Sequence, residues 1–136
     1  MSALRYLLDT NICIYIAKQR PPSVARRFAK LAIGSVGMSL ITFGELRYGA
    51  EKSSQRVQAV NTLSRLARVI PVITPGDAVA ERYGVIRTYL ERAGMPIGNN
   101  DLWIAAHALS LGVTLISNNT REFDRVPKLK LDNWVE

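Results

Sequence analysis

The chain has 136 residues, of which 48% are hydrophobic and 21% are charged, and these values are ordinary for a soluble globular protein. We expect residues 1–136 to form a single domain with its own buried core. The formal net charge of +7 and the pI near 10.0 point to a polyanionic partner, with nucleic acid ahead of an anionic membrane or an acidic protein, although a soluble protein can also be basic without such a partner.

Short apolar runs along the chain predict buried strands, and apolar residues at helical spacing lie between them. This alternation is typical of crossover connections between parallel strands. The expected fold class is therefore α/β, with three layers (α/β/α) and a central, mostly parallel sheet of four to five strands. The predicted strands are Leu4–Leu8, Val36–Leu40, Val69–Val72 and Val113–Ile116, with Lys130–Asp132 as a weaker fifth.

Helices are predicted between these strands. The first begins at Asp9-Thr10-Asn11-Ile12, directly after the first strand, and Ser53–Arg56 is a turn between two later helices. Gly94 and Gly112 are expected to end helices as C-terminal caps. The apolar stripes that define the other helices are Val24, Phe28 and Leu31; Val57, Val60, Leu63 and Ala67; Val79, Tyr83, Ile86 and Leu90; and Leu102, Ala105, Ala106 and Leu109.

Acidic and amide side chains follow the predicted strands where the strands end. Asp9 follows the first strand, Glu45 lies a few residues after the second, and Asn119 and Glu122 follow the fourth. Asp101 lies in the first turn of the helix that leads to the fourth strand. Because parallel strands share one carboxyl edge, and ligands bind at that edge in open α/β sheets, we expect these side chains to converge.

Carboxylates that converge repel one another, and their pKa values rise unless a partner neutralises them. A divalent cation is the usual solution, and oxygen ligands without a His or Cys cluster select Mg²⁺ or Mn²⁺ over Zn²⁺. In a basic protein that attracts polyanions, such an ion suggests metal-assisted phosphodiester cleavage. The predicted metal ligands are Asp9, Glu45 and Asp101.

Each acid also has a purely structural interpretation. Asp9 can be a helix N-cap, Glu45 can form a capping box with Thr42, and Asp101 can complement a helix dipole. Glu122 can be a solvated loop charge. The structural interpretation as a whole requires three caps to fall on one edge of one sheet, which favours a functional site.

The basic residues are concentrated in the first half of the chain. Residues 1–70 contain eleven Lys and Arg and three acids, whereas residues 71–136 contain seven and eight. Such a basic half fits a nucleic-acid-binding face. The candidate phosphate contacts, which can equally form a solvated helix face, are Lys18, Arg26, Arg27 and Lys30.

The remaining signals are weaker. Cys13 is the only cysteine and cannot form an internal disulfide, which favours a reducing, cytoplasmic location. No secretory signal is visible, and the longest uncharged stretch, Leu102–Thr120, contains His107 and Gly112 and does not read as a membrane span. His107 is expected to be packed or on the surface rather than catalytic. Trp103 and Trp134 are expected in the core or an interface.

Four blocks of the sequence resemble the VapC toxins of the PIN-domain ribonuclease family, in the same order, at the same spacing and almost end to end. The resemblance implies an α/β/α fold, a Mg²⁺-dependent endoribonuclease, a homodimer and a cognate VapB-type antitoxin of a type II toxin–antitoxin system. The blocks are Leu8-Asp9-Thr10-Asn11-Ile12-Cys13-Ile14-Tyr15; Ile41-Thr42-Phe43-Gly44-Glu45-Leu46-Arg47-Tyr48-Gly49-Ala50-Glu51-Lys52-Ser53; Ile97-Gly98-Asn99-Asn100-Asp101-Leu102-Trp103-Ile104-Ala105-Ala106-His107-Ala108; and Asn118-Asn119-Thr120-Arg121-Glu122-Phe123.

The resemblance places the acidic centre of the family on Asp9, Glu45 and Asp101. Many relatives have a further acid just after the fourth strand, where this chain has Asn118 and Asn119. Either Glu122 completes the site, or Asn119 holds a metal-bound water through its amide. The chain most resembles the subgroup associated with cleavage of transfer RNA in the anticodon stem-loop.

Three other classes of protein compete with this interpretation. A phosphoacceptor signalling domain needs an acceptor Asp after the third strand, where Ile73-Thr74-Pro75 stands. A haloacid-dehalogenase-like phosphatase needs a second Asp two residues after the first, where Asn11 stands. The remaining alternative is a non-catalytic nucleic-acid-binding protein of the same fold, although clustered acids facing phosphate do not serve a pure binder.

Overall fold

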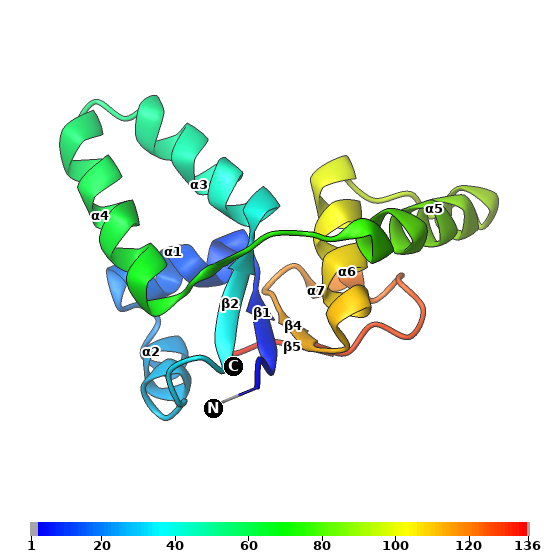
Figure 1. Ribbon diagram of the computed structural model, residues 1–136, viewed down its shortest axis with the longest axis horizontal. Coiled ribbons are helices and arrows are strands. Elements are labelled where there is room, and N and C mark those ends of the chain that lie inside the picture. Colours follow the sequence, from blue (N-terminus) through cyan, green and yellow to red (C-terminus); the bar gives the residue numbers. More distant parts are fainter. Residues whose placement is uncertain (1–2, 136) are drawn as a thin grey trace.

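A sheet of five strands, in the order β3-β2-β1-β4-β5, forms the centre of the computed structural model, which describes residues 3–135. Every pairing between neighbouring strands is parallel, so the expected sheet is confirmed. β1 is the central strand, and the strands end at a common edge (Figure 1). The strands are β1 (Tyr6–Leu8), β2 (Val36–Ser39), β3 (Val72–Ile73), β4 (Thr114–Ile116) and β5 (Leu131–Asp132).

Helices cover both faces of the sheet, which confirms the three-layer architecture. α1, α2 and α4 pack on one face and α5, α6 and α7 on the other, while α3 leaves the carboxyl edge beside α4 (Figure 1). No helix within residues 3–135 is both long and apolar enough to cross a membrane. The helices are α1 (Thr10–Lys18), α2 (Pro22–Ala29), α3 (Leu40–Glu51), α4 (Arg56–Val69), α5 (Asp77–Arg92), α6 (Asn99–Leu111) and α7 (Thr120–Phe123).

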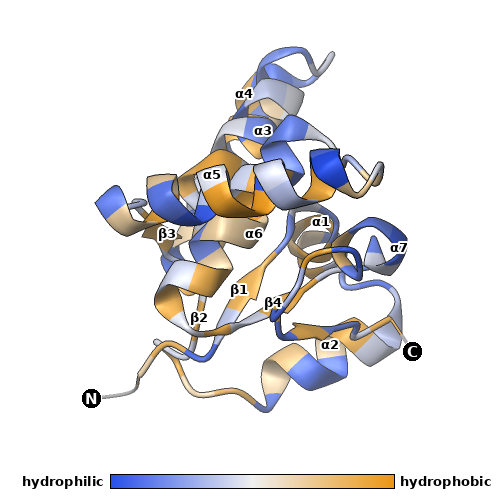
Figure 2. Ribbon diagram, turned by 90° about the vertical axis from the view of Figure 1, so that its right-hand side faces the viewer, coloured by the Kyte–Doolittle hydropathy of each residue, from blue (hydrophilic) through white to orange (hydrophobic). Residues whose placement is uncertain are grey.

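The core lies in two layers because successive strand residues point to opposite faces of the sheet. Leu7 and Leu115 pack toward α5 and α6, whereas Leu8 and Ile116 pack toward α1, α2 and α4, and all four are fully buried. The strands accordingly appear in largely hydrophobic colours in Figure 2. Apolar side chains thus cover both faces of the central strands, and polar groups of the sheet gather at the carboxyl ends of the strands.

The predicted strands overlap the observed ones, but their boundaries differ: β1 begins at Tyr6 instead of Leu4, β4 at Thr114 instead of Val113 and β5 at Leu131 instead of Lys130. The boundaries of β3 and β2 were also wrong, for reasons that the structure shows. α4 continues to Val69, and Pro71, which disfavours helical geometry in the preceding residue, ends it at Ile70. The third strand therefore begins only at Val72, not at Val69. The second strand ends at Ser39, because Leu40 already begins α3. The two glycine caps are confirmed, since Gly94 and Gly112 have φ angles of 70° and 68°.

Candidate active site

Asp9 lies at the carboxyl end of β1 and is the N-cap of α1. Its Oδ1 accepts a 2.8 Å hydrogen bond from the backbone N–H of Thr10, and its Oδ2 accepts a 2.7 Å bond from the hydroxyl of Ser117, at the end of β4. Only 4% of Asp9 is exposed, and burial raises its pKa although both hydrogen bonds oppose the shift. Asp9 is therefore both a helix cap and a buried charge in need of a cation.

Glu45 lies inside α3 and is not a capping residue. The N-cap of α3 is Ser39, whose hydroxyl accepts a 3.2 Å bond from the backbone N–H of Ile41, so the capping box with Thr42 is wrong. The Glu45 carboxylate instead accepts a 2.5 Å bond from the Thr10 hydroxyl and a 3.3 Å bond from the Asn100 amide. These contacts hold the charge of Glu45 between the first turns of α1 and α6.

Asp101 lies in the first turn of α6, as predicted, and faces the loop after β4. The Asn119 amide donates to Asp101 Oδ2 at 3.4 Å and to Glu122 Oε2 at 3.1 Å, so Glu122 is not a free loop charge. Burial, a hydrogen bond with Glu122, and the charges of Asp9, Glu122 and Glu45 raise the pKa of Asp101 to about 7. Asp101 therefore takes up a proton far more readily than an ordinary aspartate, whereas Glu122, whose pKa is lowered, does not.

Among residues 3–135, no Lys, Arg or His forms an ion pair with the acidic cluster, defined as Asp9, Glu45, Asp101 and Glu122, although the charges of Arg125 and Arg121 lower the pKa of Glu122. The ion pairs among residues 3–135 join Arg27 with Asp132, Arg47 and Arg56 with Glu51, and Arg87 with Glu91. Hydroxyl and amide donors alone contact the cluster, and an open hollow of about 440 Å³ borders it, lined by Glu45, Gly98, Asn99, Asn100 and Asp101. Within the described residues no three acidic, His or Cys side chains lie close enough together, as they stand, to hold a metal ion.

Comparison with known proteins assigns the chain to a family. Residues 6–129 match the model of the PIN domain. The chain belongs to the PIN domain family. Among individual relatives, it is 41% identical over 132 residues to ribonuclease VapC1 of Haemophilus influenzae, covering 96% of this chain and 98% of the relative. It is 42% identical over 131 residues to the tRNA(fMet)-specific endonuclease VapC of Shigella flexneri, with coverage of 96% and 98%.

A solved structure agrees with these sequence matches. VapBC-1 from nontypeable Haemophilus influenzae superimposes with a TM-score of 0.90 at 40% identity, over 98% of this chain and 100% of the matched chain. Within the PIN domain family the chain is thus one of the VapC ribonucleases, which confirms the resemblance seen in the sequence. The alternative of a non-catalytic nucleic-acid-binding protein is disfavoured, because the relatives are named as nucleases.

Three residues of this PIN-domain site were not found from the sequence. Thr10, Asn100 and Ser117 donate hydrogen bonds to the cluster from the starts of α1 and α6 and the end of β4. Each of them follows directly on a strand end or a helix start at the carboxyl edge. Their position at these ends could have identified them from the sequence, because polar side chains at the carboxyl edge converge on the same place as the acids.

His107 has a structural role in this VapC-family fold. Its ring is 1% exposed, its Nδ1 lies 2.9 Å from the Ser39 hydroxyl, and burial lowers its pKa. Trp134 is fully buried, with Tyr6 against its edge, and Trp103 stacks on Tyr83 with ring centroids 3.8 Å apart. The expectations that these residues are packed and not catalytic agree with this environment.

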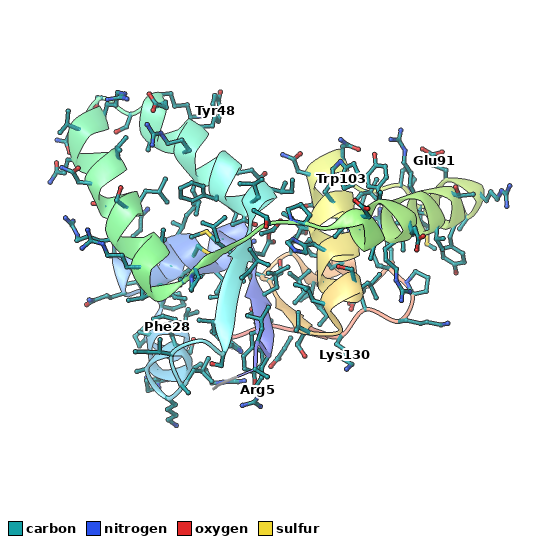
Figure 3. All side chains as sticks on the ribbon, viewed as in Figure 1. Arg5, Phe28, Tyr48, Glu91, Trp103 and Lys130 are labelled. Carbon is teal, nitrogen blue, oxygen red and sulfur yellow. The ribbon has the colours of Figure 1, made fainter. Side chains whose placement is uncertain are left out.

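The basic helix α2 lies far from the acidic cluster. Figure 3 places Phe28 of α2 and Arg5 together at the edge where the strands begin, whereas the acids lie where the strands end. Arg27 pairs with Asp132 at 3.3 Å, and its guanidinium lies 5.5 Å from the centre of the Trp134 ring. A phosphate contact by Arg26 or Arg27 therefore lies on a part of the RNA remote from the acids, and it stays a prediction.

Proposed function

We propose that this VapC-family protein is a metal-dependent endoribonuclease and the toxin of a type II toxin–antitoxin module. The observation that carries the proposal is the gathering of four carboxylates, from four separate segments, without an ion pair to any basic residue among residues 3–135. A protein with a net charge of +7 does not lack cations for ion pairs. Uncompensated acids at a ligand-binding edge are suited to hold a divalent cation, and the cation would in turn attract a phosphate.

The side chains of the cluster fit Mg²⁺ or Mn²⁺. All candidate ligands are carboxylate or amide oxygens, and the raised pKa of Asp101 reflects negative charge that a cation would offset. Asp9, Asp101 and Glu45 would hold the ion, and Glu122 or Asn119 would complete the site. When bound, the ion stabilises charge on the scissile phosphate and lowers the pKa of a bound water.

The protein's own groups prepare the site for this chemistry. The hydrogen bonds from Ser117 and the Thr10 backbone N–H lower the pKa of Asp9 and so counteract the effect of its burial. Thr10 and Asn100 fix the carboxylate of Glu45, which is thereby placed to orient the attacking water. Because the pKa of Asp101 is raised to about 7, binding of a cation at this carboxylate would release protons near neutral pH.

We further propose that the substrate is transfer RNA, cut in the anticodon stem-loop. The support is the 42% identity to a relative named as a tRNA(fMet)-specific endonuclease. The test incubates purified protein, free of any partner, with total cellular RNA and Mg²⁺, and maps the cut ends by sequencing. We expect cuts confined to one region of a few transfer RNAs, loss of cutting in EDTA and recovery with Mn²⁺. Cutting that persists in EDTA would show that the reaction needs no divalent metal.

A VapB-type antitoxin is the proposed inhibitor. The related solved structure is of a VapBC pair, and in this chain a groove of about 620 Å³ reaches the acidic cluster. We propose that a segment of the antitoxin folds into this groove with its apolar side chains and places an Arg or Lys against the carboxylates. The groove is lined by Thr10, Ile14, Ala17, Lys18, Glu45, Leu46, Gly49, Ala50, Ser53, Gln55, Gln58, Ala59, Thr62, Leu63 and Leu66.

Co-expression tests this mechanism of inhibition. The product of the gene immediately upstream is produced with the protein, isolated by pull-down and added to the cleavage assay. We expect it to bind and to inhibit, and to lose inhibition when its Arg and Lys residues near the pocket are changed to Ala. Inhibition that survives these changes would exclude the proposed cation. The homodimer that the resemblance implies stays a prediction, which sedimentation of the purified protein can check.

A further inference from the structure

An exposed aromatic side chain and a cation continue the surface of α3 beyond the acidic cluster. Tyr48 follows Glu45 by three residues and Lys52 follows it by seven, so the three side chains lie on one face of the helix. Seven residues of helix span about 10 Å. The cluster, the aromatic ring and the cation are therefore consecutive along one short path on the molecular surface.

Tyr48 is not used by the core. Its side chain is 66% exposed, and the Lys52 Nζ lies 4.5 Å from the centre of its ring. Figure 3 shows Tyr48 near the outer end of α3, on the side away from α4. An exposed aromatic ring beside an ammonium group is the combination with which proteins bind a nucleobase and its neighbouring phosphate.

The charges around this ring favour an anionic ligand. Glu51, at the end of α3, accepts hydrogen bonds from Arg47 at 2.7 Å and from Arg56 at 2.6 Å, and these guanidiniums lower its pKa to about 2. Two guanidiniums thus share one carboxylate, and Lys52 adds a third positive charge. This end of α3 is basic, in contrast to the acidic cluster, which Glu45 joins from the middle of the helix.

We propose that Tyr48 and Lys52 form a subsite for one unpaired nucleotide of the RNA substrate, next to the phosphate held at the acidic cluster. The base stacks on the Tyr48 ring, and Lys52 moves from the ring to the adjoining phosphate. The subsite deepens the proposed function, since it supplies the attraction to RNA that the acids themselves oppose. It also explains how a strand is directed to the cluster from the α3 side.

The subsite differs from the groove proposed for the antitoxin. Leu46, Gly49 and Ala50 of α3 line that groove, as does Ser53 after the helix, whereas Tyr48 does not. Glu45 borders both surfaces, because it lines the groove and precedes Tyr48 by one helical turn. A change at Tyr48 should therefore weaken RNA binding and leave antitoxin binding intact.

Binding without metal tests the subsite separately from cleavage. A labelled, single-stranded oligoribonucleotide and the same sugar-phosphate chain without bases are titrated with full-length protein in EDTA, and fluorescence anisotropy gives Kd. We expect Tyr48→Leu to raise the Kd for the RNA about tenfold (~1.4 kcal/mol). The Kd of this variant for the base-free chain should equal that of the wild type. Tyr48→Phe should bind like the wild type because it keeps the aromatic face. Tyr89→Leu, at an α5 position that is 49% exposed, is the matched control.

Two results would overturn the proposal. The first is that the wild-type protein binds the oligoribonucleotide and the base-free chain with the same Kd. The second is that the Tyr48→Leu variant binds the oligoribonucleotide as tightly as the Tyr89→Leu control does. A third observation, that Tyr48→Leu changes the oligomeric state or the antitoxin affinity but not RNA binding, assigns this surface to a protein and also rejects the subsite. If RNA binding depends on Tyr48 but no RNA is cut with Mg²⁺, the proposed nuclease function fails and the subsite stands.

Discussion

The Ser117 hydroxyl donates a 2.7 Å hydrogen bond to Oδ2 of Asp9 and thereby joins the carboxyl ends of β4 and β1 at the acidic cluster. This bond opposes the effect of burial, which raises the pKa of Asp9. It is the largest of the contacts that lower the pKa of this carboxylate, and the backbone N–H of Thr10 adds to it. A neutral neighbour therefore controls the charge of the most buried acid in the site.

Ser117→Ala should move the acid limb of the pH–rate profile to higher pH. Without the hydroxyl, the pKa of Asp9 rises further, and a hydrogen bond to a charged group is worth about 1.5–3 kcal/mol, which corresponds to a shift of about one to two pH units. The measurement is the rate of RNA cleavage between pH 5 and pH 9. Ser110→Ala is the control, since that hydroxyl bonds only the His107 carbonyl within the described chain. A limb at the wild-type pH would show that ionised Asp9 is not required.

Asp9→Asn should abolish RNA cleavage and leave the fold intact. Asn also caps helices well, so α1 keeps its N-terminal hydrogen bond while the site loses a charge. Asp9→Ala loses the cap as well and should lower the free energy of unfolding by about 1 kcal/mol. Thermal unfolding and cleavage are measured for both variants. Cleavage by Asp9→Asn at the wild-type rate in Mg²⁺ would disprove the assignment of Asp9 as a metal ligand.

Glu45→Gln should reduce the cleavage rate at least tenfold, about 1.4 kcal/mol of activation free energy, at an unchanged melting temperature. The amide can still accept from Thr10, so the local packing survives, but the negative charge is gone. Glu81→Gln, at an exposed position on α5, provides the comparison. A rate for Glu45→Gln equal to that of the comparison variant would return Glu45 to a structural role.

Asp101 predicts an unusual dependence of stability on pH in metal-free protein. Its pKa is near 3.8 when unfolded and about 7 when folded, so folding takes up a proton and stability falls as pH rises from about 4 to 7. In EDTA, the melting temperature should decrease between pH 6.5 and pH 8. This range lies above the ordinary pKa of histidine, so His107, whose lowered pKa makes stability rise with pH at lower pH, does not oppose the effect. The opposite contribution of Glu122, whose pKa is lowered, is complete in this range, and Asp9, whose pKa is raised, acts in the same direction as Asp101.

Asp101→Asn should remove most of that decrease and stabilise the metal-free protein at pH 8, while it abolishes cleavage. Asp124→Asn, a change at an exposed position just after α7, serves as the control, and its melting temperature should decrease with pH as in the wild type. Addition of Mg²⁺ should restore stability at pH 8 in the wild type but not in Asp101→Asn. An Asp101→Asn protein with the wild-type pH dependence would show that the proton resides elsewhere.

Asp9 and Asp101 could be predicted from the sequence because one rule places both. A buried apolar run fixes where a strand ends, parallel strands end together, and each acid lies at such an end or at a helix start opposite to it. The α/β class and the two glycine caps followed from equally local signals. These features depend on spacing along the chain, which the sequence contains directly.

The contacts of Glu45 could not be predicted in the same way. An error of one residue in the end of the second strand moved the N-cap from Ser39 and suggested a capping box at Thr42. The sequence did not reveal the roles of Ser117, Thr10 and Asn100, because a hydroxyl or amide residue can bond many different groups. Ser117, for example, is 108 residues from the acid that it contacts. Contacts between residues so far apart in the sequence depend on how the whole sheet packs.

The pairing of β4 with β1 has a consequence for how such an enzyme is made. Asp9 emerges from the ribosome early, but Ser117, Asn119 and Glu122 join it only when β4 takes its place beside β1. A nascent chain that has not yet reached this point lacks Glu122 and the contacts of Ser117 and Asn119, so its acidic cluster is incomplete. The order of the strands thus delays completion of the proposed site until the chain has been synthesised beyond β4.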